Sequence, residues 1–562
     1  MAMRAQVRPV HSRQRALLAA VAATVLGVGL VSVTHHAAAE LPAFTSAQPV
    51  EALDYATGVF GDAWDYSNSA DLYPESVAGA TGFSMANGAA SYSVRGSSYI
   101  VPLFGGYPGS LRIGRNGNLP ANRLDARTFT RVHVHIYVSR PTPGALLWFN
   151  QDGQKGLGGM HLNFQTGWHD YDYAIVSQFR GTTPWAGQMQ GLRLQTYAQG
   201  PTNVSVDFLR IYQPSAASRV TWQSPTGQAA QLYWSSTAAR PAGGYGSTWG
   251  PVVNGSTGLS TTGPATADLS GYPPNTAFYT VSGGHVVGAA TSLIPRPNVV
   301  VDSPSSAGCG DFATHYLGHP WRFTSTRDLA GLRNVTNVSF AGGVLSATNG
   351  APSRNDPQVY LPTGSGIDGR RWHRLTLVTS YDGAFNLGSQ PGGGTMARFM
   401  WKSQGQTLVS QTNDLVTYAG KRSIAVDLAM PVATLTEPDA RPRYAFAAAA
   451  KVTQIRFDPN EDPGARRWHI YSVRLAEDCW TQTSFNVAWH DSGFISGARA
   501  TIYAVAGSHI YTLGTVAEYA GANNYSLKAS RLPAGRYTVK VTVANKGAVG
   551  WHSASGPLII AR

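Results

Sequence analysis

The sequence predicts an all-β protein in which two β-sandwich jelly rolls alternate with two smaller β-sandwiches. Three observations lead to this prediction. The 562 residues include 62 glycines and 33 prolines, which favours strands joined by turns over helix bundles. Several short runs, such as Arg131–Val138, alternate apolar and polar residues with the period of a half-buried strand. Finally, the stretch 54–72 returns at 311–329, which indicates a duplicated unit.

The duplication determines the order of the domains. Residues 54–72 and 311–329 align without a gap at an offset of 257 residues. Seven of the nineteen aligned positions are identical, where average composition gives about one. A later strand matches as well, because Leu192–Leu194 corresponds to Ile455–Phe457. A smaller β unit follows each copy, so the chain reads large, small, large, small.

The first 39 residues predict a secretory signal peptide. They combine basic residues, an apolar run from Ala16 to Val33 and the small-residue cleavage site Ala37–Ala39. The alternative is an uncleaved anchor, since a run of this length is near the lower limit for a membrane span. After cleavage we expect no membrane span, and a protein that is secreted, either free outside the cell or associated with its surface.

The rest of the chain divides into four β domains. In the first large domain, strands are expected at 131–138, 160–165, 192–197 and 204–212, with Gly, Pro, Asn and Asp clusters between them. Including the signal peptide, the predicted ranges are 1–39, 40–213 (jelly roll), 219–302 (small), 309–479 (jelly roll) and 480–562 (small). The segments Pro214–Ser218 and Pro304–Gly308 consist of proline and small residues, so we expect accessible linkers there.

Both types of unit resemble known families. The large units resemble carbohydrate-binding modules of the galactose-binding-like jelly-roll type, on the pattern hydrophobic-Asp-x-x-x-aromatic-x-x-hydrophobic at Leu124–Val132 and Ile367–Leu375, and on Gly167–Tyr171. The small units resemble fibronectin type III or immunoglobulin-like sandwiches, notably at Leu532–Val539. The resemblance implies a polysaccharide or glycan partner. It also implies a structural calcium ion near the first and last strands of a large unit.

Charge argues against a nucleic-acid partner. The formal net charge is +13, of which four arginines lie in the leader, and the sequence contains no block of Lys and Arg. A spread surplus of this kind indicates solubility and weak attraction to acidic polymers rather than a nucleic-acid footprint.

The two cysteines, Cys309 and Cys479, predict a disulfide, because an even pair in a secreted protein is normally oxidised. They lie before the first strand and after the last strand of the second large unit. The matching positions of the first unit are Ala52 and Ser215, so only the second unit would be closed in this way.

Catalytic and metal sites are weakly indicated. Asp170 and Asp172 would share a strand face, and Glu461 adjoins Asp462, but neither pair recurs in the other large unit. We therefore predict no catalytic residue. His133 and His135 also share a face, but no third metal ligand is evident. Calcium would need six to eight oxygen ligands, and none is assigned beyond the duplicated Asp54 and Asp311 and the nearby Asp207.

The best ligand candidate is a polar face on the first large unit. In three strands a polar set alternates with an apolar set that must face the core, so the polar set is expected to face outward. Trp148 and Trp185 are expected at its rim, for stacking on sugar rings. The polar set comprises His133, His135, His161, Asn163, Gln165, Arg193, Gln195 and Tyr197. The second unit looks poorer, because Thr376, Val378 and Met400 interrupt its stripes.

These observations lead us to expect a secreted, non-catalytic protein that binds a carbohydrate or a cell-envelope polymer. Two alternatives stay open. One is an extracellular adhesin or matrix protein with protein partners at the cell surface. The other is a polysaccharide-cleaving enzyme on a jelly-roll scaffold. Fold alone does not decide among the three.

Overall fold

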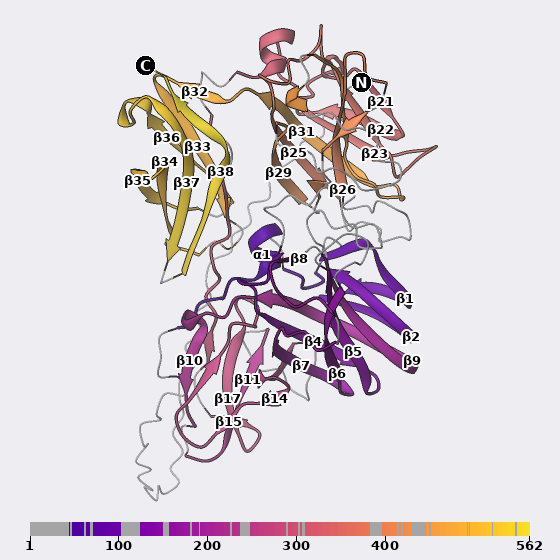
Figure 1. The fold of residues 1–562 in the computed structure, drawn as a ribbon, viewed down its shortest axis with the longest axis vertical. Helices are drawn as coiled ribbons and strands as arrows, with labels where there is room; N and C mark the ends of the chain where they lie inside the picture. The colour runs from indigo at the N-terminus through magenta and orange to yellow at the C-terminus, as the bar shows by residue number, and fades with distance from the viewer. Residues whose placement is uncertain are drawn as a thin grey trace, which may run out of the picture. The chain divides into compact units, whose positions relative to one another are not determined.

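The protein is described from a computed structural model (Figure 1). The residues that it describes are 44, 48–60, 63–67, 71–102, 124–149, 157–179, 182–189, 191–224, 227–236, 248–287, 290–301, 304–305, 310–382, 396–407, 409–412, 415–417, 420–429, 446–448, 451–491, 493, 495–519, 521–545 and 548–561. The signal segment lies outside these ranges. Pro42–Arg562 forms one compact unit.

The predicted all-β class is confirmed, since strands dominate every part of the described chain and they assemble into several separate sheets. Helices are short, the longest α-helix among the described residues being α1 (Tyr55–Phe60). Within the same residues, no helix has the length and apolar character that crossing a membrane requires.

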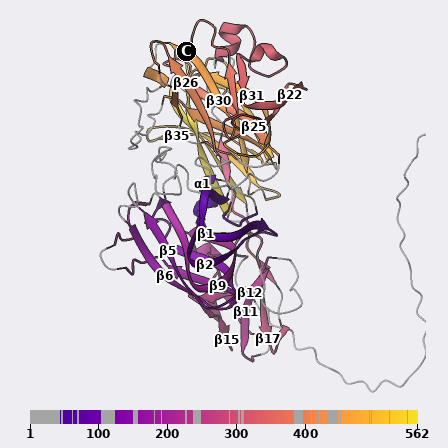
Figure 2. The same cartoon turned by 90° about the vertical axis from the view of Figure 1, so that its right-hand side faces the viewer.

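The first large unit follows α1 with nine strands, and its longest strand has two sets of partners. The strands are β1 (Leu72–Ala86), β2 (Ala89–Pro102), β3 (Leu124–Asp125), β4 (Arg131–Val138), β5 (Thr142–Phe149), β6 (Leu157–Phe164), β7 (Gly167–Ala174), β8 (Gln188–Met189) and β9 (Gly191–Tyr212). The beginning of β9 pairs with β5, and its end pairs with β4. β6 continues from β5 and β7 from β4 (Figure 1). β2 follows β9 along both halves, as Figure 2 shows beside β5 and β6.

One core joins the two halves of this sheet. Leu146 of β5, Leu194 of β9, Val134 of β4 and Leu209 of β9 belong to the same buried cluster. Because these apolar residues alternate with polar ones, each half has its second face turned away from the core. The first half is β2–β9–β5–β6, and the second is β2–β9–β4–β7.

The second large unit repeats this arrangement as two sheets around one core. Its strands are β21 (Gly331–Arg333), β22 (Val335–Ala341), β23 (Val344–Asn349), β24 (Gln358–Leu361), β25 (Arg374–Tyr381), β26 (Met396–Ser403), β27 (Ser410–Gln411), β28 (Leu415–Val416), β29 (Gly420–Asp427), β30 (Val452–Asp458) and β31 (Arg467–Ala476). One sheet has the order β21-β24-β30-β26-β27 and the other β22-β23-β31-β25-β29.

The first small unit has its own buried cluster, which includes Trp222 and Trp234. Its strands are β10 (Arg219–Trp222), β11 (Ala230–Ser235), β12 (Trp249–Pro251), β13 (Val253–Asn254), β14 (Thr257–Gly258), β15 (Ser260–Thr261), β16 (Ala265–Asp268), β17 (Ala277–Ser282), β18 (His285–Val286) and β19 (Thr291–Ser292).

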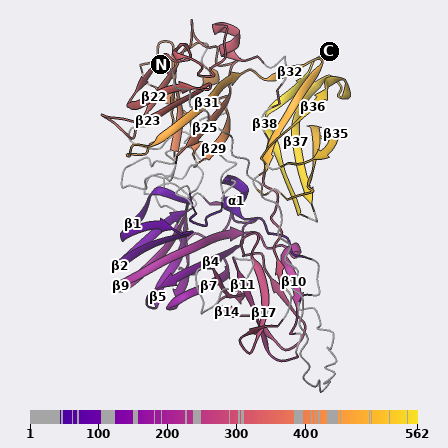
Figure 3. The ribbon, with the colours of Figure 1, turned by 180° about the vertical axis from the view of Figure 1, so that it is seen from behind.

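The second small unit is a sandwich of two sheets, β20-β33-β36 and β32-β38-β37-β34-β35. Figure 3 labels β36 of the first sheet and β32, β38, β37 and β35 of the second. Its strands are β20 (Val299–Val301), β32 (Cys479–Thr481), β33 (Ser484–Asp491), β34 (Arg499–Ala506), β35 (His509–Ala517), β36 (Gly521–Lys528), β37 (Gly535–Asn545) and β38 (Ala548–Ile560). β20 precedes the second large unit in sequence and lies inside the range 219–302, yet it pairs with β33 of this last unit.

The first repeat has the same topology. Phe44 precedes the first large unit and forms a bridge with Trp222 of the first small unit, just as Val301 pairs with Trp489 in the last. Phe44 and Val301 are separated by the repeat offset of 257 residues. Each large unit is therefore inserted after the first segment of the small unit that follows it.

The duplicated stretch is explained by a shared local structure. Asp54 Oδ2 accepts hydrogen bonds from the backbone N and the hydroxyl of Thr57, and Asp311 Oδ2 accepts the same two bonds from Thr314. This is the arrangement of an N-terminal helix cap. Trp64 and Trp321 are both buried core residues, as the repeat suggested. Asp54 and Asp311, two of the three aspartates considered for calcium, therefore act as caps.

The segments expected to be open linkers are hydrogen-bonded where the structure describes them. Ser218 is fully buried, and its hydroxyl donates to the carbonyl of Val50. Ser305 exchanges two backbone hydrogen bonds with Asn486. The expectation of accessible backbone is therefore wrong for these residues, because each segment pairs with a neighbouring strand or turn.

Candidate functional site

A row of side chains crosses four strands on the outer side of the first half-sheet. Tyr99 of β2 pairs with Gln195 of β9, Gln195 pairs with Ala145 of β5, and Ala145 pairs with His161 of β6. Directly paired residues point to the same face of a sheet. Ala145 is small and fully buried, so the row has no exposed side chain at its centre, between the amide of Gln195 and the imidazole of His161.

Neighbouring positions extend this surface, which we call the Tyr99 face: Tyr99, His161, Asn163, Gln195 and Tyr197. Asn163 and His161 are exposed on β6, and Tyr197 is 37% exposed on β9. Gln195 Nε2 donates to Ser97 Oγ over 2.7 Å, which orients the amide. The face therefore offers imidazole, amide and phenol groups, all of which can bond hydroxyl-rich ligands.

Arg193 and Gln165 contribute less than the sequence predicted. Arg193 lies on the same side as Gln195, but its guanidinium stacks 4.3 Å from the Tyr99 ring centroid and 5.1 Å from that of Phe149, and the residue is only 8% exposed. Gln165 is exposed just beyond the end of β6, where its backbone N donates to the Tyr171 hydroxyl. Arg193 thus stiffens the Tyr99 face more than it extends it.

The two tryptophans expected at the rim belong mainly to the core. Trp148 is fully buried, and its Nε1 donates to the carbonyl of Thr183. Trp185 is half-buried, packs edge-on against Trp148 and donates to the carbonyl of Phe129. The rim position is therefore wrong for Trp148, because its side of β5 faces the sandwich interior.

The expectation that His133 and His135 face solvent is also wrong. They lie on β4, in the second half-sheet, and are 0% and 1% exposed. His133 Nε2 lies 2.8 Å from Asp170 Oδ1, and His135 Nδ1 lies 3.3 Å from the same oxygen. The other oxygen of Asp170 accepts a 2.8 Å hydrogen bond from Trp234 Nε1 of the first small unit.

The first small unit covers this second half-sheet. Phe208 of β9 belongs to the buried cluster of the small unit, and Asp172 of β7 exchanges two backbone hydrogen bonds with Gly255. A side chain at Gly271 would meet His133 Nδ1 at 2.6 Å, so the close approach requires glycine there. β4 has the alternation that the sequence predicts, but its polar side faces another domain instead of water.

The interface contains a buried cluster of ionisable groups, formed by Asp170 with His133 and His135. Burial by itself raises the pKa of the Asp170 carboxyl, but the charge of His135 and hydrogen bonds from His133 and His135 outweigh it, so the pKa lies well below its usual value. Asp172 accepts from Arg131 and from the Tyr212 hydroxyl. Both carboxylates of the pair weighed as catalytic are thus engaged, that of Asp170 across the interface and that of Asp172 within the large unit.

The second large unit has a hollow on the corresponding face. Trp401 of β26 is buried and pairs with Ile455, as Trp148 of β5 pairs with Leu192, so β26 corresponds to β5 and β30 to β9. A hollow of about 600 Å³ opens on the outer side of β24, β30 and β26. We call it the Tyr360 hollow; its lining includes Arg333, Tyr360, Thr363, Lys402, Thr453 and Gln454.

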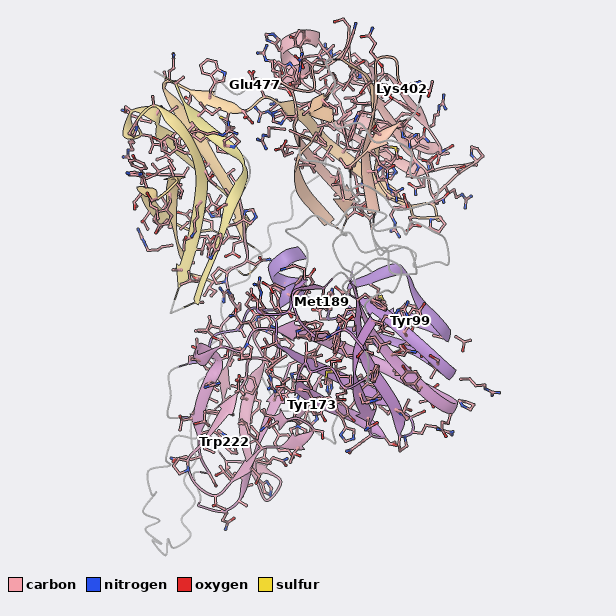
Figure 4. The ribbon with its side chains drawn as sticks, in the orientation of Figure 1. Tyr99, Tyr173, Met189, Trp222, Lys402 and Glu477 are labelled. Atoms are coloured by element: carbon pink, nitrogen blue, oxygen red, sulfur yellow. The ribbon has the colours of Figure 1, made fainter. Side chains whose placement is uncertain are left out.

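The Tyr360 hollow combines an aromatic ring with polar side chains, which suits a ligand that has hydroxyl groups around a ring with apolar C–H faces. Arg333 lies 5.8 Å from the Tyr360 ring centroid, and the Tyr360 hydroxyl donates to Gln358 Oε1. Figure 4 labels Lys402 in this unit and Tyr99 in the first. The sequence carried the signal, since Tyr360, Lys402 and Gln454 each adjoin a core residue. The sequence predicted a poorer face here because of Thr376, Val378 and Met400, but Thr376 and Val378 lie on the other sheet, and Met400 of β26 is the one that lies on this sheet.

Two further sequence predictions concern metals and cysteines. Among the described residues, no group of three or more His, Cys, Asp or Glu side chains could hold a metal ion. Glu461 is paired with Arg398, and Asp462 with Arg466, so this second carboxylate pair is also engaged. Cys479 is buried at the start of β32, whereas Cys309 lies outside the described residues, so their disulfide stays a prediction.

Comparisons with known proteins find no matching family model and no matching curated protein. Among solved structures, the chain is similar to a family 29 carbohydrate-binding module, at 10% identity over 32% of this chain and 89% of that one, with a TM-score of 0.18. A mutant of such a module complexed with cellulohexaose is similar at 10% identity over 32% of this chain and 92% of that one, also with a TM-score of 0.18. An agarase is similar at 9% identity over 29% of this chain and 26% of that one, with a TM-score of 0.18. Similarities at this TM-score carry no argument about what this chain binds.

Proposed function

We propose that this chain is a secreted, non-catalytic protein that binds carbohydrate or a cell-envelope polymer through the same sheet face of both large units. The observation that carries the proposal is the correspondence of the Tyr99 face and the Tyr360 hollow. Each lies on the outer side of the half-sheet whose core side holds Trp148 or Trp401. Duplication thus yields two sites on one chain.

The chemistry of the two faces supports a sugar ligand. Phenol rings can pack on the C–H faces of pyranose rings, while amide, imidazole and ammonium groups bond the hydroxyls. Tyr197 and Tyr99 supply the rings in the first unit, and Tyr360 does so in the second. Two weak sites on one chain raise the affinity for a repeating polymer without any new contact.

The adhesin alternative and the enzyme alternative predict different chemistry. Long exposed apolar surfaces or open sheet edges would favour a protein partner, whereas both faces are mainly polar. Glycoside hydrolysis needs two carboxyl groups across a groove, and the Tyr360 hollow has no Asp or Glu among its described lining residues. The polar faces therefore favour sugar binding over both alternatives.

Retention of the full chain on insoluble polymers tests the proposal. The polymers are microcrystalline cellulose, chitin and peptidoglycan, preceded by a glycan-array screen. We expect retention on at least one polymer, and Asn163→Ala on the Tyr99 face should weaken it by about fivefold, since an exposed side chain that bonds a hydroxyl is lost. Gln178→Ala, whose side chain accepts from the His161 backbone beside that face, is the matched control. Absence of binding to every glycan and polymer would refute the proposal.

A further inference from the structure

The last small unit carries an open face that has no part in the sites described above. On the sheet β38-β37-β34-β35, Trp551 pairs with Thr542, Thr542 with Thr501, and Thr501 with Thr515. Paired residues share a face, and Trp551 is 57% exposed, so an indole and three hydroxyls line up across four strands. Alternate residues Ile502, Val541 and Val543 fill the core on the other side.

Cations flank this row. Lys540 Nζ lies 4.1 Å from the centroid of the Trp551 ring, and Lys540 pairs with Tyr503 in the next row of the same sheet. On the other side of the row, Arg499 is exposed and pairs with Ala544. We call this surface the Trp551 face: Arg499, Thr501, Tyr503, Thr515, Lys540, Thr542 and Trp551.

Positively charged residues outnumber negatively charged ones in this unit. The sequence from 484 to 562 contains seven Lys and Arg residues but only two acids, Asp491 and Glu518. Both acids are buried, at 5% and 4% exposure. Burial of the Glu518 carboxyl, and after it the negative charge of Asp491, raises its pKa to about 7. The surface charge of the described part of this unit is therefore positive.

We propose that the Trp551 face binds an anionic polysaccharide, that is, a chain of sugars bearing carboxylate, sulfate or phosphate groups. One pyranose ring stacks on the indole of Trp551, and the threonine row bonds the hydroxyls of the next sugars. Lys540 and Arg499 pair with the acidic groups on either side. The positive surface favours an anionic ligand, and the exposed indole of Trp551 beside a row of hydroxyls favours a sugar chain over a nucleic acid.

This site is independent of the two faces on the large units. It differs from the Tyr99 face in charge, since that face has neutral amide and phenol groups whereas Lys540 and Arg499 flank the Trp551 face. The Tyr360 hollow also holds two cations, Arg333 and Lys402, but it lies on another unit. A protein with both types of site can hold a neutral and an acidic polymer at once. The two proposals therefore fail separately.

Affinity electrophoresis of the full chain in gels containing polygalacturonate tests the proposal, with neutral dextran in parallel gels. We expect retardation by polygalacturonate alone, weakened by raising NaCl from about 0.05 M to about 0.5 M, because salt screens exposed charges. Trp551→Ala should weaken binding about tenfold and Lys540→Gln about threefold.

Matched controls separate this face from general effects. Lys528→Gln removes the same charge from the other sheet of the same unit, and Tyr316→Ala removes an aromatic side chain of similar exposure, 55%, from the second large unit. Both should bind as wild type does, as should Asn163→Ala. Wild-type affinity in Trp551→Ala and Lys540→Gln would overturn the proposal, as would equal retardation by dextran or stronger retardation by double-stranded DNA.

Discussion

His133 and His135 in the first large unit occupy the places that Thr376 and Val378 hold in the second. His135 pairs with Asp170 and Phe208 on its two sides, whereas Val378 pairs with Ser423 and Ser472. The backbone register is thus the same, and a whole set of neighbouring side chains has changed together.

The comparison separates what packing requires from what it leaves free. Buried positions such as Trp64 and Trp321, or Trp148 and Trp401, are identical because interiors are close-packed and tolerate little change in volume. The outer side of β4 and β25 has no such constraint. In the first unit it carries a buried His–Asp–Trp cluster that contacts the small unit, and in the second it carries small, partly exposed residues.

The largest expected effect on stability comes from the disulfide, which is predicted for the second large unit and has no counterpart in the first. The Cys309–Cys479 disulfide would contribute on the order of 5 kcal/mol to the second unit by the chain-entropy model, and the first unit has no counterpart. We expect Cys309→Ala, Cys479→Ala and the double variant to lose the same stability in chemical denaturation, because either change removes the whole bond. Two free thiols in the denatured, non-reduced protein would contradict this.

Removing the charge at the centre of the His–Asp–Trp cluster should have the next largest effect. Asp170→Asn leaves buried histidines without their carboxylate, and breaking such a pair costs about 3 kcal/mol. The matched change in the second unit is Thr376→Ala, at the place of His133, which should cost no more than about 0.5 kcal/mol. Denaturation followed by tryptophan fluorescence measures both; equal, small losses would show that the cluster does not stabilise the interface.

The same residue predicts a dependence on pH. Because the folded pKa of Asp170 is below its ordinary value, its contribution to stability is present above about pH 4 and is lost as the pH falls below that. Wild type should therefore lose stability on acidification more steeply than Asp170→Asn. Parallel pH profiles of the two proteins would contradict the assignment.

The fold was predictable because its signals are local. Period-two alternation identified the strands, and the repeated Asp and Thr of the caps, with Trp64 and Trp321, revealed the duplication. The faces were harder, because alternation shows that a strand has a polar side without showing what covers it. The side of His161 and Asn163 is open, whereas that of His133 is covered by a domain whose main part follows residue 218 in the sequence. The excess of Lys and Arg over Asp and Glu in the last unit is visible in the sequence, but the net charge of the whole chain does not show where the excess lies.

The central claim is that the two large units bind carbohydrate through the same face. It is tested most directly by measuring retention on the best insoluble polymer for wild type, Tyr197→Ala on the Tyr99 face, Tyr360→Ala in the hollow, and the double variant. Tyr519→Ala, a 68% exposed aromatic change in the last unit, is the control. We predict that each single variant weakens binding about fivefold to tenfold, that the double variant loses nearly all of it, and that the control binds as wild type does. Wild-type retention of the double variant would contradict the account.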